Sequence, residues 1–343
     1  MATEKTMLNE RNIKIILSNN YNIKEIINIV KIDIGTSNIF KVETKHGKYI
    51  LKEFNSNKSI NLIKKEVDLI NFLSNKNISV PKYIKTIHSN YYFTFKGKII
   101  ILQKFIEGYT IIDNTANFNE LINVANTYGR LIIALKDYQE LSDENIIEKW
   151  FSKNTLLKGK EKIKKELLNI RENNIYKDQY LKDLNIKLNI IDKLLIDFDF
   201  NIISKLTIMN THGDYNVQQL IFNNKEITIL DFERAKKMPI IWEIMRSYSY
   251  TDSNAKNGLM DINNLIAYIK EISKFILLNE FDLKYSAYIY LIQLVSSTYG
   301  YKEYNQDYNQ IKLLNFGFFR TKLCKNLYKN LNTIGDSLIE NIL

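Results

Sequence analysis

The chain has 343 residues, 45% of them hydrophobic and 12% aromatic, which is enough to bury more than one core. We therefore expect a folded protein of two lobes. No apolar run approaches the ~18 residues that span a bilayer, so we expect no membrane contact. The opening segment, MATEKTMLNERNIKII, lacks the order of a secretory signal, which predicts a cytoplasmic protein. The single cysteine, Cys324, excludes an internal disulfide and is expected in the core.

The formal net charge is +10, from 48 basic and 38 acidic residues, and such a balance raises the possibility of an anionic partner. The lysines are scattered, however. The densest run, LLKGKEKIKKELL at 156–168, alternates lysine with glutamate and leucine at helical spacing, which is typical of a solvated helix face. We therefore expect no nucleic-acid partner.

The first hundred residues predict a small antiparallel sheet. β-branched and aromatic residues alternate in short segments that Gly35, Gly97 and the pair His46–Gly47 interrupt. Between the third and fourth segments, apolar residues at three- and four-residue spacing predict a helix over 60–73. The predicted strands are 29–34, 39–44, 48–54, 91–96 and 98–105. The first lobe, residues 1–105, is thus predicted to have five strands and one helix.

From about Asn119 the apolar residues follow a helical period, including a long stretch at 149–195 and everything after Trp242. Two short strands joined by a turn at Asn223 and Asn224 interrupt this pattern. Residues 106–343 are therefore predicted to form a second, mostly helical lobe. Together the two lobes give an α+β fold.

Two aspartates flank that predicted hairpin, in the segments THGDYNVQQLIF and KEITILDFE. Asp214 lies just before the first strand and Asp231 ends the second. In phosphoryl transfer, the protein mainly has to orient a hydroxyl and hold magnesium against a triphosphate, so carboxylates in two roles suffice. No P-loop motif occurs, and the three histidines are too scattered for a hydrolase triad or a histidine metal site.

The pattern HGDYNVQQLIF followed by ITILDFE resembles the aminoglycoside phosphotransferase and choline kinase family, over about residues 29–248. The resemblance implies a bilobal, protein-kinase-like fold and ATP-dependent transfer of the γ-phosphate to a hydroxyl of a small molecule. It implies ATP and magnesium as cofactors, Asp214 as the catalytic residue, and Asp231 and Gln219 as metal ligands. Gln219 stands where the family has asparagine. Glu243, in PIIWEIMRSY, stands where the family has aspartate.

The resemblance extends to a nucleotide site in the first lobe. GTSNIFKVETKHGKYILKEF matches a phosphate loop and its strands, and ILQKFIEG matches the hinge that holds adenine. An ion pair between a strand lysine and a helix glutamate would place the ammonium on the phosphates. The implied nucleotide-binding residues are Gly35, Thr36, Ser37, Asn38, Lys52, Glu66, Gln103 and Phe105. His212 is expected to be structural, packing beneath the catalytic loop.

The acceptor stays open at this stage: aminoglycosides, homoserine, choline, ethanolamine and other sugars are all used by relatives. Asp252, Glu303 and Asp307 could supply acid to an acceptor pocket. A second hypothesis is a kinase-shaped binding or spore-coat-type protein with little or no transfer, although such a relative is expected to lose Asp214 or Asp231. The expected partners are a nucleotide and a small hydroxyl acceptor.

Overall fold

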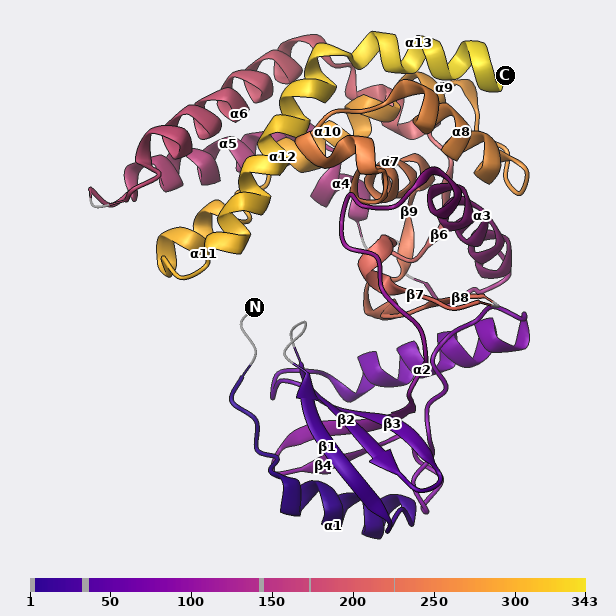
Figure 1. Ribbon diagram of the computed structural model, residues 1–343. Helices are drawn as coiled ribbons and strands as arrows, with labels where there is room; N and C mark the ends of the chain where they lie inside the picture. Colours follow the sequence, from indigo (N-terminus) through magenta and orange to yellow (C-terminus); the bar gives the residue numbers. More distant parts are fainter. Residues whose placement is uncertain (1–3, 33–36, 142–144, 173, 225) are drawn as a thin grey trace. The chain divides into compact units, whose positions relative to one another are not determined.

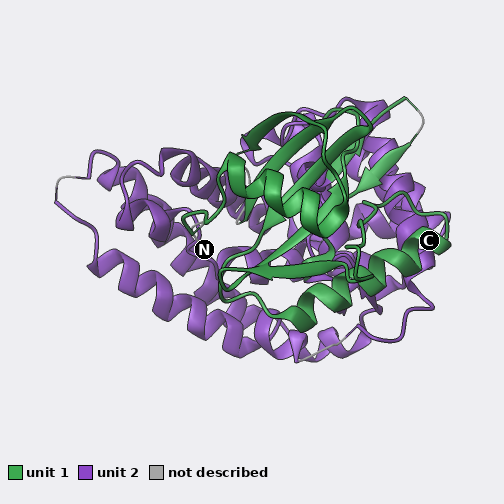
Figure 2. Cartoon of the chain, turned by 90° about the horizontal axis from the view of Figure 1, so that it is seen from below, with its two compact units in different colours: residues 1–110, 220–233 green, residues 111–219, 234–343 purple. Residues whose placement is uncertain are grey.

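The computed structural model describes residues 4–32, 37–141, 145–172, 174–224 and 226–343 (Figure 1). The chain divides into two compact units (Figure 2). Unit 1 is Met1–Thr110 with Leu220–Glu233, and unit 2 is Ile111–Gln219 with Arg234–Leu343. The hairpin that the sequence analysis assigns to the second lobe is therefore grouped with unit 1. The lobe boundary at 105/106 stays a prediction.

Unit 1 contains a five-stranded antiparallel sheet in the order β1-β2-β3-β5-β4, so all five predicted strands are present. Its strands are β1 Ile26–Ile32, β2 Asn38–Thr44, β3 Gly47–Glu53, β4 Tyr92–Phe95 and β5 Lys98–Lys104. Between β2 and β3 the chain turns at Gly47, whose φ of 144° is a conformation that glycine adopts readily. The predicted helix is α2, Ile60–Asn75, and its buried residues include Ile63, Val67 and Leu73.

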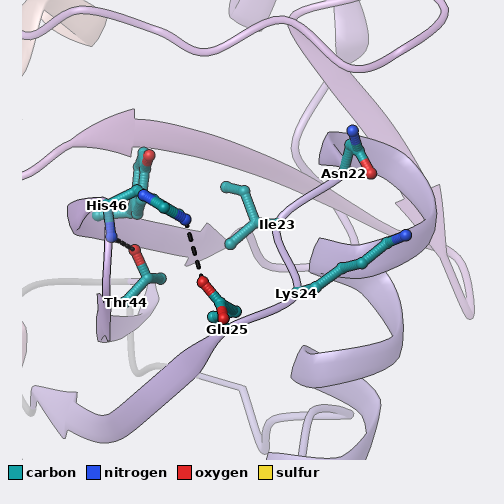
Figure 3. Close-up of a pocket in the computed structure, with 7 residues that line it drawn as sticks. Asn22, Ile23, Lys24, Glu25, Thr44 and His46 are labelled. Carbon is teal, nitrogen blue, oxygen red and sulfur yellow. Dashed lines mark hydrogen bonds and ion pairs between the residues drawn. The ribbon is translucent and has the colours of Figure 1, made fainter.

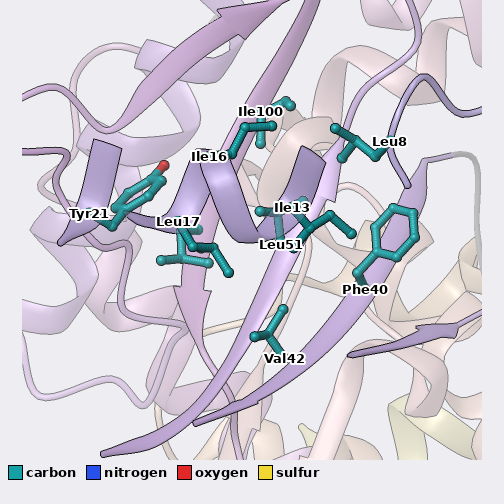
Figure 4. Close-up of a cluster of buried hydrophobic side chains, with 10 residues drawn as sticks. Leu8, Ile13, Ile16, Leu17, Tyr21, Phe40, Val42, Leu51 and Ile100 are labelled. Atoms are coloured by element: carbon teal, nitrogen blue, oxygen red, sulfur yellow. The ribbon is translucent and has the colours of Figure 1, made fainter. Parts of the chain in front are cut away.

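The expectation of a single helix in this part of the chain is wrong, because α1, Glu10–Tyr21, precedes the sheet. Asn9 caps the start of α1, and Asn22 ends it in a left-handed conformation with φ 53°. Ile13 and Leu17 are fully buried in a cluster with residues of β2, β3 and β5, as Figure 4 shows. Helix α1 therefore completes the core on its face of the sheet.

The hairpin of unit 1 consists of β7, Leu220–Phe222, and β8, Ile227–Ile229. Phe222 exchanges two backbone hydrogen bonds with Tyr109, and the amide of Ile229 donates to the carbonyl of Ser79 at 2.9 Å. The hairpin is thus fixed to the segments that follow α2 and β5, and this contact sets the position of Asp231, which comes directly after β8.

Unit 2 is mostly helical, as predicted, and it contains one further two-stranded sheet of β6, Ile208–Thr211, and β9, Lys236–Pro239. The predicted helical stretch at 149–195 is divided into α4, α5 and α6. Cys324 is fully buried, as expected. The helices are α3 Phe118–Leu135, α4 Ile146–Trp150, α5 Lys153–Leu168, α6 Lys177–Asp197, α7 Ile240–Thr251, α8 Ile262–Ser273, α9 Glu280–Lys284, α10 Ser286–Val295, α11 Tyr301–Gln306, α12 Ile311–Lys329 and α13 Leu331–Ile342. Among the residues described, no helix has the length and apolar character to cross a membrane.

The packing of α1 predicts that Leu17→Ala lowers the free energy of unfolding by about 2–5 kcal/mol, because it opens a cavity in a fully buried cluster. The matched control is Ile15→Ala on the same helix, where the side chain is 48% exposed and the expected change is within about 0.5 kcal/mol. Urea unfolding followed by circular dichroism measures both. Equal effects of the two substitutions would contradict this account of α1.

Candidate active site

The loop after β6 carries Asp214 and is held by one buried carboxylate. Glu243 lies on α7 with no exposed surface, and it accepts hydrogen bonds from the amides of His212 and Tyr215 at 3.0 and 3.1 Å. The hydroxyl of Tyr128 donates to the same carboxylate at 2.8 Å. Burial raises the pKa of Glu243, and the neighbouring His212 and these donors oppose that rise. The loop conformation therefore depends on an acceptor supplied by α7.

The two residues that precede Asp214, His212 and Gly213, shape this loop. His212 is fully buried, and its Nδ1 lies 3.3 Å from the amide nitrogen of Asp214, which agrees with a structural role. Gly213 has φ 79°, and a Cβ built there would lie 1.9 Å from the carbonyl oxygen of Arg234. No other residue type fits without moving the backbone. The close approach brings the segment after Asp231 against the loop of Asp214 within unit 2.

The two oxygens of the Asp214 carboxylate have different surroundings. Oδ1 forms an ion pair with Nη2 of Arg246, from α7, and lies 3.3 Å from Nδ2 of Asn216. Oδ2 has only Nη1 of Arg234 nearby, at 3.6 Å, and that side chain is 58% exposed. The guanidinium of Arg246 also packs over the ring of Tyr250, 5.1 Å from its centroid. Oδ1 is thus held by two close donors, whereas the contact of Oδ2 with Arg234 is longer.

Three amide side chains follow Asp214, and only one of them is uncommitted. Asn216 donates to the carbonyl of Asp214 at 2.8 Å and accepts from the amide of Gln218 at 2.9 Å. The Gln218 side chain donates to Asp113 Oδ2 at 2.6 Å. The Gln219 side chain forms no hydrogen bond within the described ranges. Of these three amides, its side chain is therefore the one free to bind a cation, and the predicted metal contact stays a prediction.

Asp231 lies in unit 1, directly after β8, in a left-handed backbone conformation with φ 60°. Such a conformation is uncommon outside glycine, and it is found at functional sites. Its Oδ1 is buried and has no hydrogen-bond partner in the described part of the chain. A buried carboxylate oxygen without a donor suits a hard divalent cation, which prefers oxygen ligands. These residues therefore fit a magnesium ligand set that includes Asp231.

Glu66 on α2 is 5% exposed, and burial raises its pKa while the charge of Lys52 opposes the rise. The two charges interact, yet no ion pair joins them among the residues that the structure describes. Instead, Lys52 Nζ lies 5.0 Å from the centre of the Phe54 ring, and Tyr83 is a neighbour of Glu66. The predicted direct Lys52–Glu66 contact is therefore corrected to a longer-range one.

Two residues of this neighbourhood were missed by the sequence analysis. Lys58 forms an ion pair with Glu233 at 2.6 Å, and its charge also lowers the pKa of Glu66. Tyr83 lies beside Glu66 and Gln103, and burial, followed by the charge of Glu66, raises the pKa of its hydroxyl well above the usual range. Neither lies in a recognisable motif, so only the packing of α2 on the sheet identifies them.

The structure describes only part of the predicted phosphate loop, together with the predicted hinge. Gly35 and Thr36 lie outside the described residues. Ser37 and Asn38 are buried, and the Asn38 side chain donates to Glu53 Oε2 at 2.8 Å, which leaves only its backbone for a phosphate. In the hinge, the amide of Phe105 already donates to the carbonyl of Lys48 at 3.0 Å. An adenine contact at Phe105 would therefore use its carbonyl group.

The acids suggested for an acceptor pocket serve local structure. Asp252 is 1% exposed, caps the turn after α7 and accepts from Tyr248 at 2.5 Å. Glu303 accepts from the amide of Gly300 at 2.7 Å. Asp307 accepts from the amide of Asn309 at 3.0 Å. Each of the three thus has at least one carboxylate oxygen engaged by a donor of the chain, and their role at an acceptor stays a prediction.

A separate cavity in unit 1 lies beside the turn between β2 and β3 (Figure 3). His46 Nε2 lies 3.1 Å from Glu25 Oε2 there, and the histidine is a turn residue as expected. Within the described ranges, no group of three or more His, Cys, Asp or Glu side chains could hold a metal. This cavity therefore has neither catalytic nor metal-binding features.

A pH-dependent effect on stability follows from Asp113. Burial raises the pKa of its carboxyl from 3.8 to about 6, although Arg246 and Gln218 oppose the rise. Because the folded-state pKa is the higher one, the stability that the protonated carboxyl contributes is full below pH 4 and is lost as the pH rises through 6. Asp113→Asn should therefore stabilise the protein at pH 7.5 by at most about 3 kcal/mol, and this gain should shrink towards pH 4.

Urea unfolding at several pH values measures this effect. The control is Asp307→Asn, because the pKa of Asp307 is shifted in the opposite direction. The Asp307 carboxylate is exposed, and the amide of Asn309 lowers its pKa. Its contribution to stability is therefore lost as the pH falls, and its replacement should not stabilise the protein at pH 7.5. A pH-independent effect of Asp113→Asn would show that its carboxyl is not perturbed.

Known proteins share this architecture and these motifs. Residues 28–268 match the family model described as the phosphotransferase enzyme family. An aminoglycoside phosphotransferase from Alicyclobacillus acidocaldarius is 12% identical with a TM-score of 0.68, over 97% of this chain and 98% of that one. A spectinomycin phosphotransferase in complex with ADP and spectinomycin is 13% identical with a TM-score of 0.65, over 97% and 100%. A microcompartment-associated aminopropanol kinase is 10% identical with a TM-score of 0.66, over 95% and 99%.

No curated protein sequence matches the chain significantly. At these identities the solved structures show the fold alone, and they confirm the predicted α+β, protein-kinase-like architecture. The family model covers more than half of the chain and includes both aspartate segments. The chain therefore belongs to the phosphotransferase enzyme family, whose members are small-molecule kinases.

Proposed function

We propose that this protein transfers the γ-phosphoryl group of ATP to a hydroxyl group of a small molecule. The observation that carries the proposal is Asp231, whose strained backbone holds a buried carboxylate oxygen that has no donor in the described part of the chain. Such an oxygen is costly unless a cation binds it. Family membership and the nucleotides bound to similar structures, ADP among them, support a nucleoside triphosphate as donor.

Asp214 is the proposed catalytic base. Its Oδ1 is fixed by Arg246 and Asn216, so Oδ2, which has only the longer contact with Arg234 among the described residues, would accept the proton of the acceptor hydroxyl. That hydroxyl oxygen forms a bond to the γ-phosphorus as the bond between this phosphorus and the β,γ-bridging oxygen breaks. The products are ADP and a phosphate ester. The buried Glu243 would keep the loop, and with it Oδ2, in position.

Asp231 and Gln219 are the proposed magnesium ligands, and Lys52 is proposed to contact the phosphates with Glu66 behind it. Magnesium, when bound, would neutralise the charge that develops on the phosphate oxygens. Because no ion pair joins Lys52 to Glu66 among the described residues, the Lys52 ammonium would be available to a phosphate. The remaining nucleotide contacts are proposed for the backbone from Gly35 to Asn38 and for the hinge at Gln103 and Phe105.

The two aspartates predict opposite kinetic phenotypes. Asp214→Asn should leave nucleotide affinity within a few-fold and lower transfer by about a hundred-fold or more, because a positioned base is lost. Asp231→Asn should weaken binding of magnesium–ATP, since a metal ligand is lost. Calorimetric titration of the nucleotide, together with ADP release across a panel of hydroxyl acceptors, separates the two. If Asp214→Asn instead lost nucleotide affinity but turned over the bound nucleotide at the normal rate, Asp214 would be the metal ligand and not the base.

The uncommitted side chain of Gln219 predicts a shift in magnesium dependence. Gln219→Ala should raise the magnesium concentration that gives half-maximal transfer, whereas Gln219→Asn should keep much of the activity, because both amides supply a hard oxygen. Asn216→Ala and Gln218→Ala are the controls, since their side chains bond to Asp214 and Asp113 instead. If the magnesium requirement changed in either control but not in Gln219→Ala, the metal ligand would be Asn216 or Gln218 and not Gln219.

A further inference from the structure

Arginine is rare in this chain, and its distribution is uneven. The sequence has 42 lysines and only six arginines. Arg234 and Arg246 both approach the Asp214 carboxylate, and Arg320 is a third arginine of the same unit. Arginine holds oxyanions with a planar fork of donors that lysine lacks. Two of the six arginines therefore lie at one candidate catalytic aspartate, which calls for a chemical reason.

Arg246 and Arg320 lie around a single aromatic cluster. The Arg246 guanidinium lies 5.1 Å from the Tyr250 ring centre, and that ring stacks on Phe316 at 5.7 Å. The Arg320 guanidinium lies 5.7 Å from the centre of the Phe316 ring. Each ring of the stacked pair thus has one arginine beside it. Burial raises the pKa of Tyr290, and both guanidinium charges oppose the rise, so this hydroxyl lies near both.

Both of these guanidinium groups hold buried donors without partners. Nη1 of Arg246 and Nε of Arg320 are buried and form no hydrogen bond in the described part of the chain. Arg320 is only 7% exposed, and no described acid forms an ion pair with it; its Nη1 donates to Ser297 Oγ at 3.1 Å. A buried, unpaired cation is unfavourable, and an anionic ligand is the chemistry that would relieve it.

A cavity of about 720 Å³ adjoins this cluster within unit 2. Its wall includes Ser297, which Arg320 contacts, and Tyr299, whose pKa both Arg320 and Arg234 lower against the effect of burial. Trp150 lines it as well, and its ring lies 5.0 Å from that of Trp242, over which Arg246 packs. The cavity wall thus adjoins Arg320 through Ser297 and Arg246 through the two tryptophans.

The charged lining of this cavity is mostly basic. Of its two acids, Glu303 accepts from the amide of Gly300, and burial raises the pKa of Glu166, which disfavours its charge. The cationic lining residues are Lys149, Lys162, Lys165 and Lys302. A polyamine acceptor would meet this surface with like charge, whereas an oxyanion would meet opposite charge.

We propose that the acceptor carries an oxyanion, a carboxylate or a phosphate, which Arg320 and Arg246 bind while its hydroxyl faces Asp214. The inference rests on the proposed transfer reaction and narrows its acceptor to anionic hydroxyl compounds. Arg234, exposed beside Asp214 Oδ2, adds positive charge at the same place. The acids that share this neighbourhood with Asp214 and Arg246 are already engaged: Glu243 accepts from the loop amides, and Asp113 Oδ2 accepts from Gln218.

The test is calorimetric titration of the full-length protein, without nucleotide, by four probes. Glycerate and glycerol 3-phosphate carry the two kinds of oxyanion, glycerol is the neutral match, and ethanolamine is the cationic one. We expect glycerate, glycerol 3-phosphate or both to bind at least tenfold more tightly than glycerol and ethanolamine. The ratio of the dissociation constants of glycerate and glycerol 3-phosphate shows whether the site prefers a carboxylate or a phosphate. ADP release from ATP, measured separately with each compound, tests the transfer reaction itself, so the two claims fail independently.

Arg320→Gln should weaken oxyanion binding about tenfold or more, the amount expected for losing a charge-assisted pair of hydrogen bonds. Arg130→Gln, at an exposed arginine of α3, is the matched control and should bind like the wild type. Lys302→Gln, at an exposed wall residue, should weaken binding about two- to fivefold and replaces Arg320→Gln if that variant does not fold. Tighter binding of ethanolamine or glycerol, or oxyanion affinity unchanged in the folded variants of Arg320 and Lys302, would overturn the proposal.

Discussion

The buried carboxylate of Glu243 is the interaction on which the candidate active site depends. It accepts hydrogen bonds from two amides of the Asp214 loop and from Tyr128, so α3, α7 and the loop meet at one group. Buried backbone amides are unfavourable unless they are paired, and Glu243 supplies an acceptor to both. The tight passage at Gly213 then brings Arg234 beside Asp214. The orientation of Asp214 is therefore a consequence of packing on α7 rather than of the loop sequence alone.

The two aspartates differ in their surroundings, and the proposed chemistry follows from that difference. Asp214 has guanidinium groups near both oxygens, one of them buried, whereas Asp231 has a buried oxygen with no donor among the described residues. A carboxylate that is already paired can be held in place to orient a hydroxyl, while an unpaired one calls for a metal ion. The intervening amides divide in the same way, since only Gln219 is uncommitted. Separate roles for Asp214 and Asp231 thus rest on different local environments.

The sequence predicts the elements that depend on local patterns and misses those that depend on packing. All five strands of unit 1 and helix α2 follow from alternation and helical periodicity, and the HGD and DFE segments locate both aspartates. Helix α1 is missed because the exposed Ile15 lies among its buried apolar residues, which blurs the apolar period. Likewise, no spacing links Arg246 or Arg320 to Asp214. Their significance appears only when α7 and α12 fold around the same aromatic cluster.

The predicted contact of Lys52 with Glu66 shows the same limit. Register places Lys52 on β3 and periodicity places Glu66 on the buried face of α2, as predicted. Their interaction depends on neighbours that the sequence does not identify: Phe54 lies beneath the lysine, and Tyr83 lies beside the glutamate. Motif resemblance thus locates both residues, while the packing of α2 determines how directly they interact.

Amide hydrogen exchange of the His212 and Tyr215 backbones tests the central claim most directly, by comparing the wild type with Glu243→Gln. A glutamine side chain has one carbonyl oxygen and turns an NH₂ group towards donors, so it cannot accept both amides. We predict that at least one of the two amides exchanges about tenfold or more faster in the variant, while Leu51 in the sheet of unit 1 keeps its wild-type rate. Unchanged exchange at both His212 and Tyr215 would contradict the account, because the loop would then hold its conformation without Glu243.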